Sequence, residues 1–128
     1  MIVIDTHVLI WWLSEPRKLT RKASRALKGA KRVGVPAISI WELAMLASRG
    51  RIRLDRSPLD WLNTALDEPR VELVPLTPSI AVQSTRLTHF HGDPADRLIV
   101  ATAIVEAAPL VTADARIAEL ASVEVLWD

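Results

Sequence analysis

Four acidic side chains lie far apart in the sequence, three of them just beyond apolar runs and one in the first turn of a predicted helix. They are Asp5 after residues 2–4, Glu42 after 33–38, Asp96 in the helix that opens at Asp93 and Pro94, and Asp114 after 110–112. In a parallel α/β sheet the C-terminal ends of the strands share one edge, so these acids are predicted to gather there. Gathered carboxylates repel one another, and hard divalent cations such as Mg²⁺ and Mn²⁺ relieve that repulsion. The pattern therefore predicts a metal site.

Each acid also has a purely structural interpretation. Asp5 and Asp114 can cap the helices that follow them, and Asp93 can do the same for its own helix. Ser39 and Glu42 match the Ser-x-x-Glu capping box. Taken singly, capping is favoured over catalysis. Taken together, acids after the first, second and fourth predicted strands favour a metal, because Ser or Thr would cap equally well.

The sequence lacks the residues and motifs that several other enzyme chemistries require. The chain has no cysteine, which excludes thiolate zinc sites and cysteine nucleophiles. Its four glycines are widely spaced, so no phosphate-binding loop is present, and no Gly-x-Ser-x-Gly elbow occurs. The three histidines, His7, His89 and His91, do not form an obvious zinc set. A metal-bound water is the most available nucleophile.

The elements that must position these acids alternate between short apolar runs and helical segments, as in an α/β fold with a mainly parallel sheet. With 128 residues, the chain is predicted to form a single domain over residues 1–128. Thr20, Ser57 and Thr77 stand where helix N-caps are expected. Strands are predicted at 2–5, 33–38, 71–75, 109–113 and 123–127, and helices at 7–14, 20–31, 39–49, 58–67, 78–88, 94–107 and 114–121.

Charge is distributed unevenly along the chain, although the net charge is only +1. Residues 17–56 hold twelve basic and two acidic residues, whereas residues 57–128 hold four basic and eleven acidic residues. This asymmetry indicates either a basic face for a polyanion or acidic partner, or a solvated helix surface. The apolar run at 8–13 is far too short to cross a bilayer, and a cytoplasmic protein without a membrane partner is expected.

Four motifs in order resemble those of PIN-domain nucleases. They are residues 2–6 (IVIDT), 39–43 (SIWEL), 93–103 (DPADRLIVATA) and 110–114 (LVTAD). The opening Asp5-Thr6-His7, followed by Trp11 and Trp12, resembles the VapC-type toxins of bacterial toxin–antitoxin pairs. The resemblance covers essentially the whole chain.

The resemblance implies a three-layer α/β/α sandwich with a five-stranded, mainly parallel sheet, and Mg²⁺- or Mn²⁺-dependent endoribonuclease activity of a toxin. Its four acids map onto Asp5, Glu42, Asp96 and Asp114, all as catalytic metal ligands. Asp93 is interpreted as a supporting acid, and Thr6 and Thr112 resemble the family's hydroxyl residues that orient acids or water.

The resemblance also implies partners. RNA is the expected substrate, and the basic stripe of one predicted helix is interpreted as an RNA-binding face. Arg97 is a further candidate phosphate contact, although an ordinary ion-pair arginine is the favoured interpretation. Trp11 and Trp12 cannot face the same side of one helix, so one is expected to be covered by a homodimer partner or a cognate antitoxin. The stripe consists of Arg21, Lys22, Arg25 and Lys28.

One alternative from another class stays open at this point. A non-catalytic RNA- or protein-binding module could keep the same fold and bind through the basic helix without metal. A phosphatase or phospho-receiver is less favoured, because the first predicted strand ends in a single acid, Asp5, and not in a close acidic pair.

Overall fold

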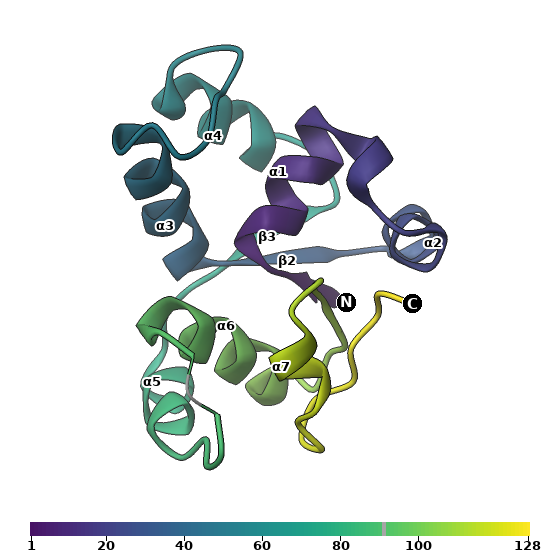
Figure 1. Ribbon diagram of the computed structural model, residues 1–128, viewed down its shortest axis with the longest axis vertical. Coiled ribbons are helices and arrows are strands. Elements are labelled where there is room, and N and C mark those ends of the chain that lie inside the picture. The colour runs from purple at the N-terminus through teal and green to yellow at the C-terminus, as the bar shows by residue number, and fades with distance from the viewer. Residues whose placement is uncertain (91) are drawn as a thin grey trace.

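A four-stranded parallel sheet forms the centre of the computed structural model, which describes residues 1–90 and 92–128 (Figure 1). The strand order is β3-β2-β1-β4, and every neighbouring pair is parallel. Each crossover between strands runs through at least one helix, as parallel connections require. The strands are β1 (Ile2–Ile4), β2 (Val33–Pro36), β3 (Val71–Val74) and β4 (Leu110–Val111).

The helices follow the predicted order, and α2, α4 and α5 begin at their predicted caps. The hydroxyls of Thr20, Ser57 and Thr77 each accept a hydrogen bond from the backbone amide three residues later. None of the helices in the described part of the chain is long and apolar enough to span a membrane. The helices are α1 (Thr6–Ser14), a 3₁₀ turn η1 (Pro16–Lys18), α2 (Arg21–Gly29), α3 (Ala37–Ser48), α4 (Pro58–Leu66), α5 (Pro78–Thr85), α6 (Pro94–Val105) and α7 (Ala115–Ala118).

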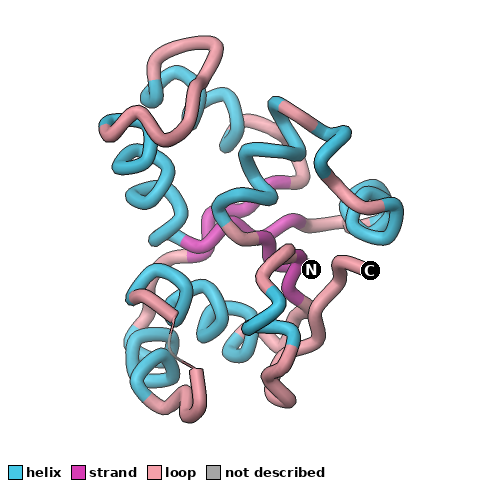
Figure 2. Tube along the Cα trace, viewed as in Figure 1, coloured by secondary structure: helices cyan, strands magenta, loops and turns pink. Residues whose placement is uncertain are grey.

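Helices cover both faces of the sheet, which gives three layers (Figures 1 and 2). Alternate residues of β1 point to opposite faces: Ile2 and Ile4 pack with α1, α2 and α4, whereas Val3 packs with α6 and α7. Both faces are therefore apolar, and the central strands are continuous hydrophobic runs, as expected of a buried parallel sheet.

The register brings the C-terminal ends of β1 and β4 together. Val3 pairs with Leu110 and Ile4 with Val111, and the Asp5 amide donates to the Val111 carbonyl at 3.2 Å. The residues that follow the two strands, Asp5 and the segment up to Asp114, therefore leave the sheet side by side.

The predicted fifth strand at 123–127 does not form as a strand. Val125 makes only an isolated parallel bridge to Leu110. Beyond it the chain turns toward α2, where the Thr20 hydroxyl donates to the Trp127 carbonyl. Because β4 is only two residues long, it provides too few backbone hydrogen-bond partners to hold residues 123–127 as a strand of the sheet. The described sheet has four strands, not five.

The predicted capping box at Ser39 and Glu42 is wrong. Helix α3 begins at Ala37, directly after β2, so Ser39 lies inside its first turn and is fully buried. The Ser39 hydroxyl accepts a hydrogen bond from the Thr6 hydroxyl at 3.0 Å. Glu42 is consequently not drawn back to an N-cap amide.

Packing of α2 on the sheet depends on Leu27, which is 1% exposed. Leu27→Ala should lower the free energy of unfolding by about 3 kcal/mol, because it removes buried methyl groups and leaves a cavity. Urea denaturation measures the change. Lys28→Ala, at the neighbouring exposed position, is the control and should change stability by less than about 0.5 kcal/mol. Equal effects of the two variants would contradict this packing.

Candidate metal centre

A cleft of about 460 Å³ opens at the C-terminal edge of the sheet and contains all four predicted acids. They come from the end of β1, from α3, from the first turn of α6 and from the N-cap of α7. A larger cleft of about 620 Å³ lies between the end of α1 and α4, but it holds none of the predicted site residues. The acids in the first cleft are Asp5, Glu42, Asp93, Asp96 and Asp114.

Asp5 is the most constrained of these acids. One carboxylate oxygen accepts from the Val8 amide at 2.9 Å, which caps α1, and the other accepts from the Thr112 hydroxyl at 2.5 Å. Burial raises the pKa of Asp5 above its ordinary value, and the hydrogen bonds from Thr112 and Val8 oppose that rise. Thr112 also accepts from the Asp114 amide at 3.1 Å, so this one hydroxyl links two of the acids.

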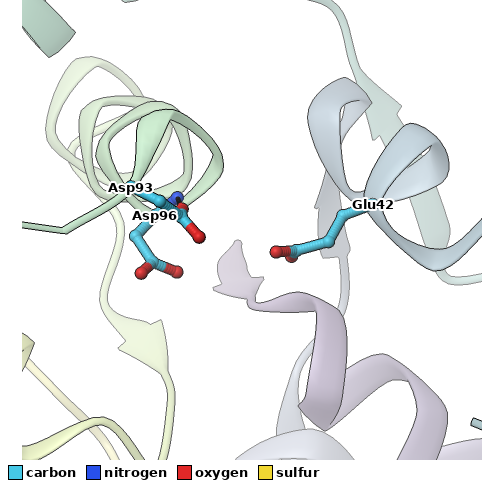
Figure 3. A group of neighbouring side chains, drawn as sticks. All are labelled: Glu42, Asp93 and Asp96. Carbon is cyan, nitrogen blue, oxygen red and sulfur yellow. Dashed lines mark hydrogen bonds between the residues drawn. The ribbon is translucent and has the colours of Figure 1, made fainter. Parts of the chain in front are cut away.

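Glu42, Asp93 and Asp96 approach one another across the cleft. One carboxylate oxygen of each lies within 4.8 Å of the others. Figure 3 shows Glu42 extending from α3 toward Asp93 and Asp96, which lie together at the start of α6. Asp93 caps α6 by accepting from the Asp96 amide at 2.8 Å. Asp93 is thus both the predicted cap and a member of the cluster.

Asp96 experiences the crowding most strongly. Its pKa is raised to about 6, first by burial and then by the nearby charges of Asp93, Glu42 and Asp114. The positive charge of Arg116 opposes the rise. A carboxyl that ionises against three neighbouring acids is stabilised by any cation that enters the cleft.

Arg116 is a residue of this site that the sequence analysis missed. Its guanidinium contacts Asp114 at 2.7 Å and 3.2 Å and Asp96 at 3.2 Å. The paired contact lowers the pKa of Asp114, chiefly through hydrogen bonding from Arg116. Asp114 also caps α7 through the Arg116 amide. Only the position of Arg116 two residues after a mapped acid could have drawn attention to it.

Two other predicted residues make hydrogen bonds that do not reach the acids, although Thr6 lines the cleft. The Thr6 hydroxyl donates to Ser39 and not to an acid. Arg97 does not line the cleft; its guanidinium donates to the carbonyls of Ser84, Leu87 and Phe90 at 2.7–3.1 Å. Those bonds tie the segment between α5 and α6 to the start of α6. Arg97 thus supports the helix that carries Asp96, and its guanidinium is not placed for the predicted phosphate contact.

The basic stripe of α2 faces outward, away from the buried Ala23 and Leu27. Arg21, Lys22 and Arg25 line a shallow groove of about 470 Å³ together with Trp127, whereas Lys28 is exposed near the end of the helix. Trp127 packs against Trp11 with ring centroids 5.8 Å apart, and Trp11 lines the acidic cleft. The basic groove and the cleft are therefore linked through two aromatic rings.

The donor set of the cleft fits a hard divalent cation. All candidate ligands are carboxylate oxygens, which Mg²⁺ and Mn²⁺ prefer, and their mutual repulsion is what such a cation relieves. The metal-ligand cluster found among the described residues contains no histidine. His91 lies outside the described residues, and the exposed His7 lines the cleft beside Asp5.

The fold has parallels among solved protein structures. VapBC2 from Rickettsia felis, solved bound to a promoter DNA fragment, matches with a TM-score of 0.75, 18% identity and 100% coverage of both chains. A toxin–antitoxin complex from Klebsiella pneumoniae matches with a TM-score of 0.69 and 21% identity, over 96% of this chain and 95% of that one. At such identities these structures establish the fold alone.

Sequence comparison defines the family. The model of the PIN domain family matches residues 2–123, and the chain belongs to that family. Ribonuclease VapC22 from Mycobacterium tuberculosis is 44% identical over 117 residues, which cover 91% of this chain and 88% of that protein. The resemblance that the four motifs indicated is thereby confirmed.

The raised pKa of Asp96 makes stability depend on pH. The pKa of Asp96 is about 6 in the folded chain, against an ordinary value of 3.8. Between these two pH values the folded chain binds more protons than the unfolded chain, so the stability of the wild type falls as the pH rises through this range. In EDTA, Asp96→Asn should remove this loss, so its stability relative to wild type should increase by about 1 kcal/mol from about pH 4 to about pH 7. Urea denaturation at the two pH values measures it.

Asp60→Asn is the matched control for this experiment. Asp60 and Asp96 both occupy the third position of a helix that begins with proline, but Asp60 is exposed on α4. The same pH-dependent gain in both variants would show that the helix position, and not the acidic cleft, is responsible.

Proposed function

We propose that this protein is a metal-dependent endoribonuclease and the toxin component of a toxin–antitoxin pair. The observation that carries the proposal is the convergence of Asp5, Glu42, Asp96 and Asp114 in one cleft of a PIN-domain chain. The relative named Ribonuclease VapC22 supports RNA as the substrate. We also propose that residues 1–128 act as one domain, since the core clusters on both faces share one sheet.

The metal ligands are assigned from the geometry of the cleft. Glu42 and Asp96 supply oxygens that converge with one of Asp93, which also caps α6. Asp5 and Asp114 line the same cleft and complete the proposed set. A divalent cation bound there would activate water for in-line attack and stabilise charge on the phosphate. Both Mg²⁺ and Mn²⁺ fit this donor set, because both prefer carboxylate oxygens.

The other residues of the site fix the acids in place. Thr112 holds the Asp5 carboxylate and the Asp114 amide, which keeps the ends of β1 and β4 in one arrangement. Arg97 anchors the segment before α6, and so the position of Asp96. Such rigid support matters because small displacements of reacting groups lower rates strongly.

The basic groove on α2 is the proposed secondary contact for RNA. Arg21, Lys22 and Arg25 are exposed and lie beside Trp127. Cations that contact phosphates next to an aromatic ring are typical of single-strand binding surfaces. Lys28 extends the positive field along the helix.

A cognate antitoxin is the proposed protein partner. The Klebsiella pneumoniae structure, which shares the fold, is a toxin–antitoxin complex. A homodimer is proposed separately, because Trp41 on α3 is 58% exposed. A large aromatic side chain so exposed is more typical of an interface than of a solvated surface.

Asp5→Asn should reduce cleavage of bulk RNA by more than about 100-fold, because even the hydrogen-bond partners of metal ligands contribute about 10–100-fold. Gel analysis of RNA incubated with Mn²⁺ or Mg²⁺ measures cleavage, and EDTA should abolish it. Asp67→Asn, at an exposed acid outside the cleft, should retain wild-type activity. Robust cleavage by purified Asp5→Asn would refute the proposed site, and RNA binding without turnover by wild type would favour the non-catalytic module.

Trp41→Glu should convert the proposed homodimer to a monomer, because it places a charge in an interface that buries this ring. Sedimentation velocity of the free toxin measures the change. Leu59→Glu is the control, because Leu59 is also a large apolar side chain, 68% exposed, but lies on α4 and not on α3. A monomeric wild-type protein, or a dimer that survives Trp41→Glu, would contradict the homodimer.

A further inference from the structure

The acidic cleft contains its own counter-ion. Arg116 lies at the start of α7, and its side chain is 58% exposed, so it forms part of the wall of the cleft rather than of the core. The guanidinium carbon lies 5.9 Å from the centroid of the buried Phe90 ring, which supports it from one side. The side chain is therefore held over the acids and does not extend freely into solvent.

The contacts of Arg116 with the two acids are unequal. Asp114 accepts hydrogen bonds from two donors of Arg116, Nε at 3.2 Å and Nη2 at 2.7 Å, one to each carboxylate oxygen. Asp96 receives a single contact, from the same Nη2 at 3.2 Å. A cation that takes Asp96 can replace this weaker contact, while the paired contact with Asp114 still anchors the arginine.

The remaining donors of Arg116 are available for an anion. Its bonds to carboxylates use Nε and Nη2, and within residues 1–90 and 92–128 no hydrogen bond is assigned to Nη1. A planar guanidinium anchored on one edge presents its other edge in a fixed direction, and that geometry suits a phosphate. A polyanion that enters a cleft with five acids also needs a cation beside them.

We propose that Arg116 is a substrate-positioning residue: anchored by Asp114, it binds a phosphate of the RNA, and it competes with the divalent cation for Asp96. This inference rests on the proposed nuclease function and assigns the phosphate contact to Arg116 in place of Arg97. Asp114 then acts mainly through the arginine that it holds.

Two readouts on Arg116→Gln test the two parts of the proposal. Mn²⁺ affinity, measured by electron paramagnetic resonance without RNA, should rise about two- to fivefold, because a partly exposed ion pair no longer competes for Asp96. The affinity for a short single-stranded RNA in EDTA should fall about tenfold. The plot of log affinity against log salt concentration has a negative slope, and the magnitude of that slope should decrease by about 0.7, the value for one lost phosphate contact. In cleavage assays KM should rise about tenfold with kcat changed by less than about threefold.

Arg53→Gln is the matched control. Arg53 is likewise an exposed arginine, but it lines the cleft between α1 and α4 and not the acidic one. It should leave Mn²⁺ affinity unchanged. Arg116→Lys keeps the charge and loses the paired geometry, so it should restore the salt slope but only part of the KM effect. Circular dichroism melting verifies that the variants fold.

The possible results distinguish a failure of the proposed nuclease function from a failure of the role proposed for Arg116. Wild-type protein that neither binds Mn²⁺ nor cleaves RNA would overturn the nuclease function itself. Wild-type activity together with unchanged Mn²⁺ affinity, salt slope and KM in Arg116→Gln would overturn the role of Arg116 alone. A fall in melting temperature as the only change would do the same, because it would leave Arg116 with a purely structural role at α7.

Discussion

Repulsion among carboxylates at one edge of a parallel sheet is the constraint on which this structure depends. The fold concentrates acids there because every strand ends on that side. Burial, together with the charges of neighbouring carboxylates, raises the pKa values of Asp5 and Asp96. Such an arrangement persists only when the surrounding bonds hold the acids in place. Here the hydrogen bonds of Thr112, the N-caps of α1, α6 and α7, and Arg116 supply that restraint.

Three acids combine helix capping with a place in the lining of the acidic cleft. Asp5, Asp93 and Asp114 each accept a backbone amide at a helix start, and each also lines the cleft. A carboxylate has two oxygens with several lone pairs, so one can satisfy the helix while another faces the site. The helix caps therefore orient the acids, and the sheet edge brings the caps together.

Local sequence predicted most of the elements and the members of the acid set. The caps at Thr20 and Thr77 are confirmed because N-capping is decided within four residues. The capping box at Ser39 failed because α3 begins directly after β2 and buries that serine against Thr6. The fifth strand failed for a related reason: an apolar alternating run forms a strand only where a neighbouring strand is long enough to pair with it, and β4 is not.

By itself, the sequence determined the α/β class, the four motifs and the acids that converge, because hydrophobic periodicity and short-range spacing carry that information. Only the tertiary structure decided which of the acids bring their carboxylate oxygens close together. It placed Asp93 close to Glu42 and Asp96. It also directed the Arg97 guanidinium to backbone carbonyls, and it placed Arg116 between Asp96 and Asp114. These outcomes depend on contacts between residues far apart in the chain and on side-chain direction, which are set by packing of α3, α6 and α7 around the sheet edge and not by any local pattern.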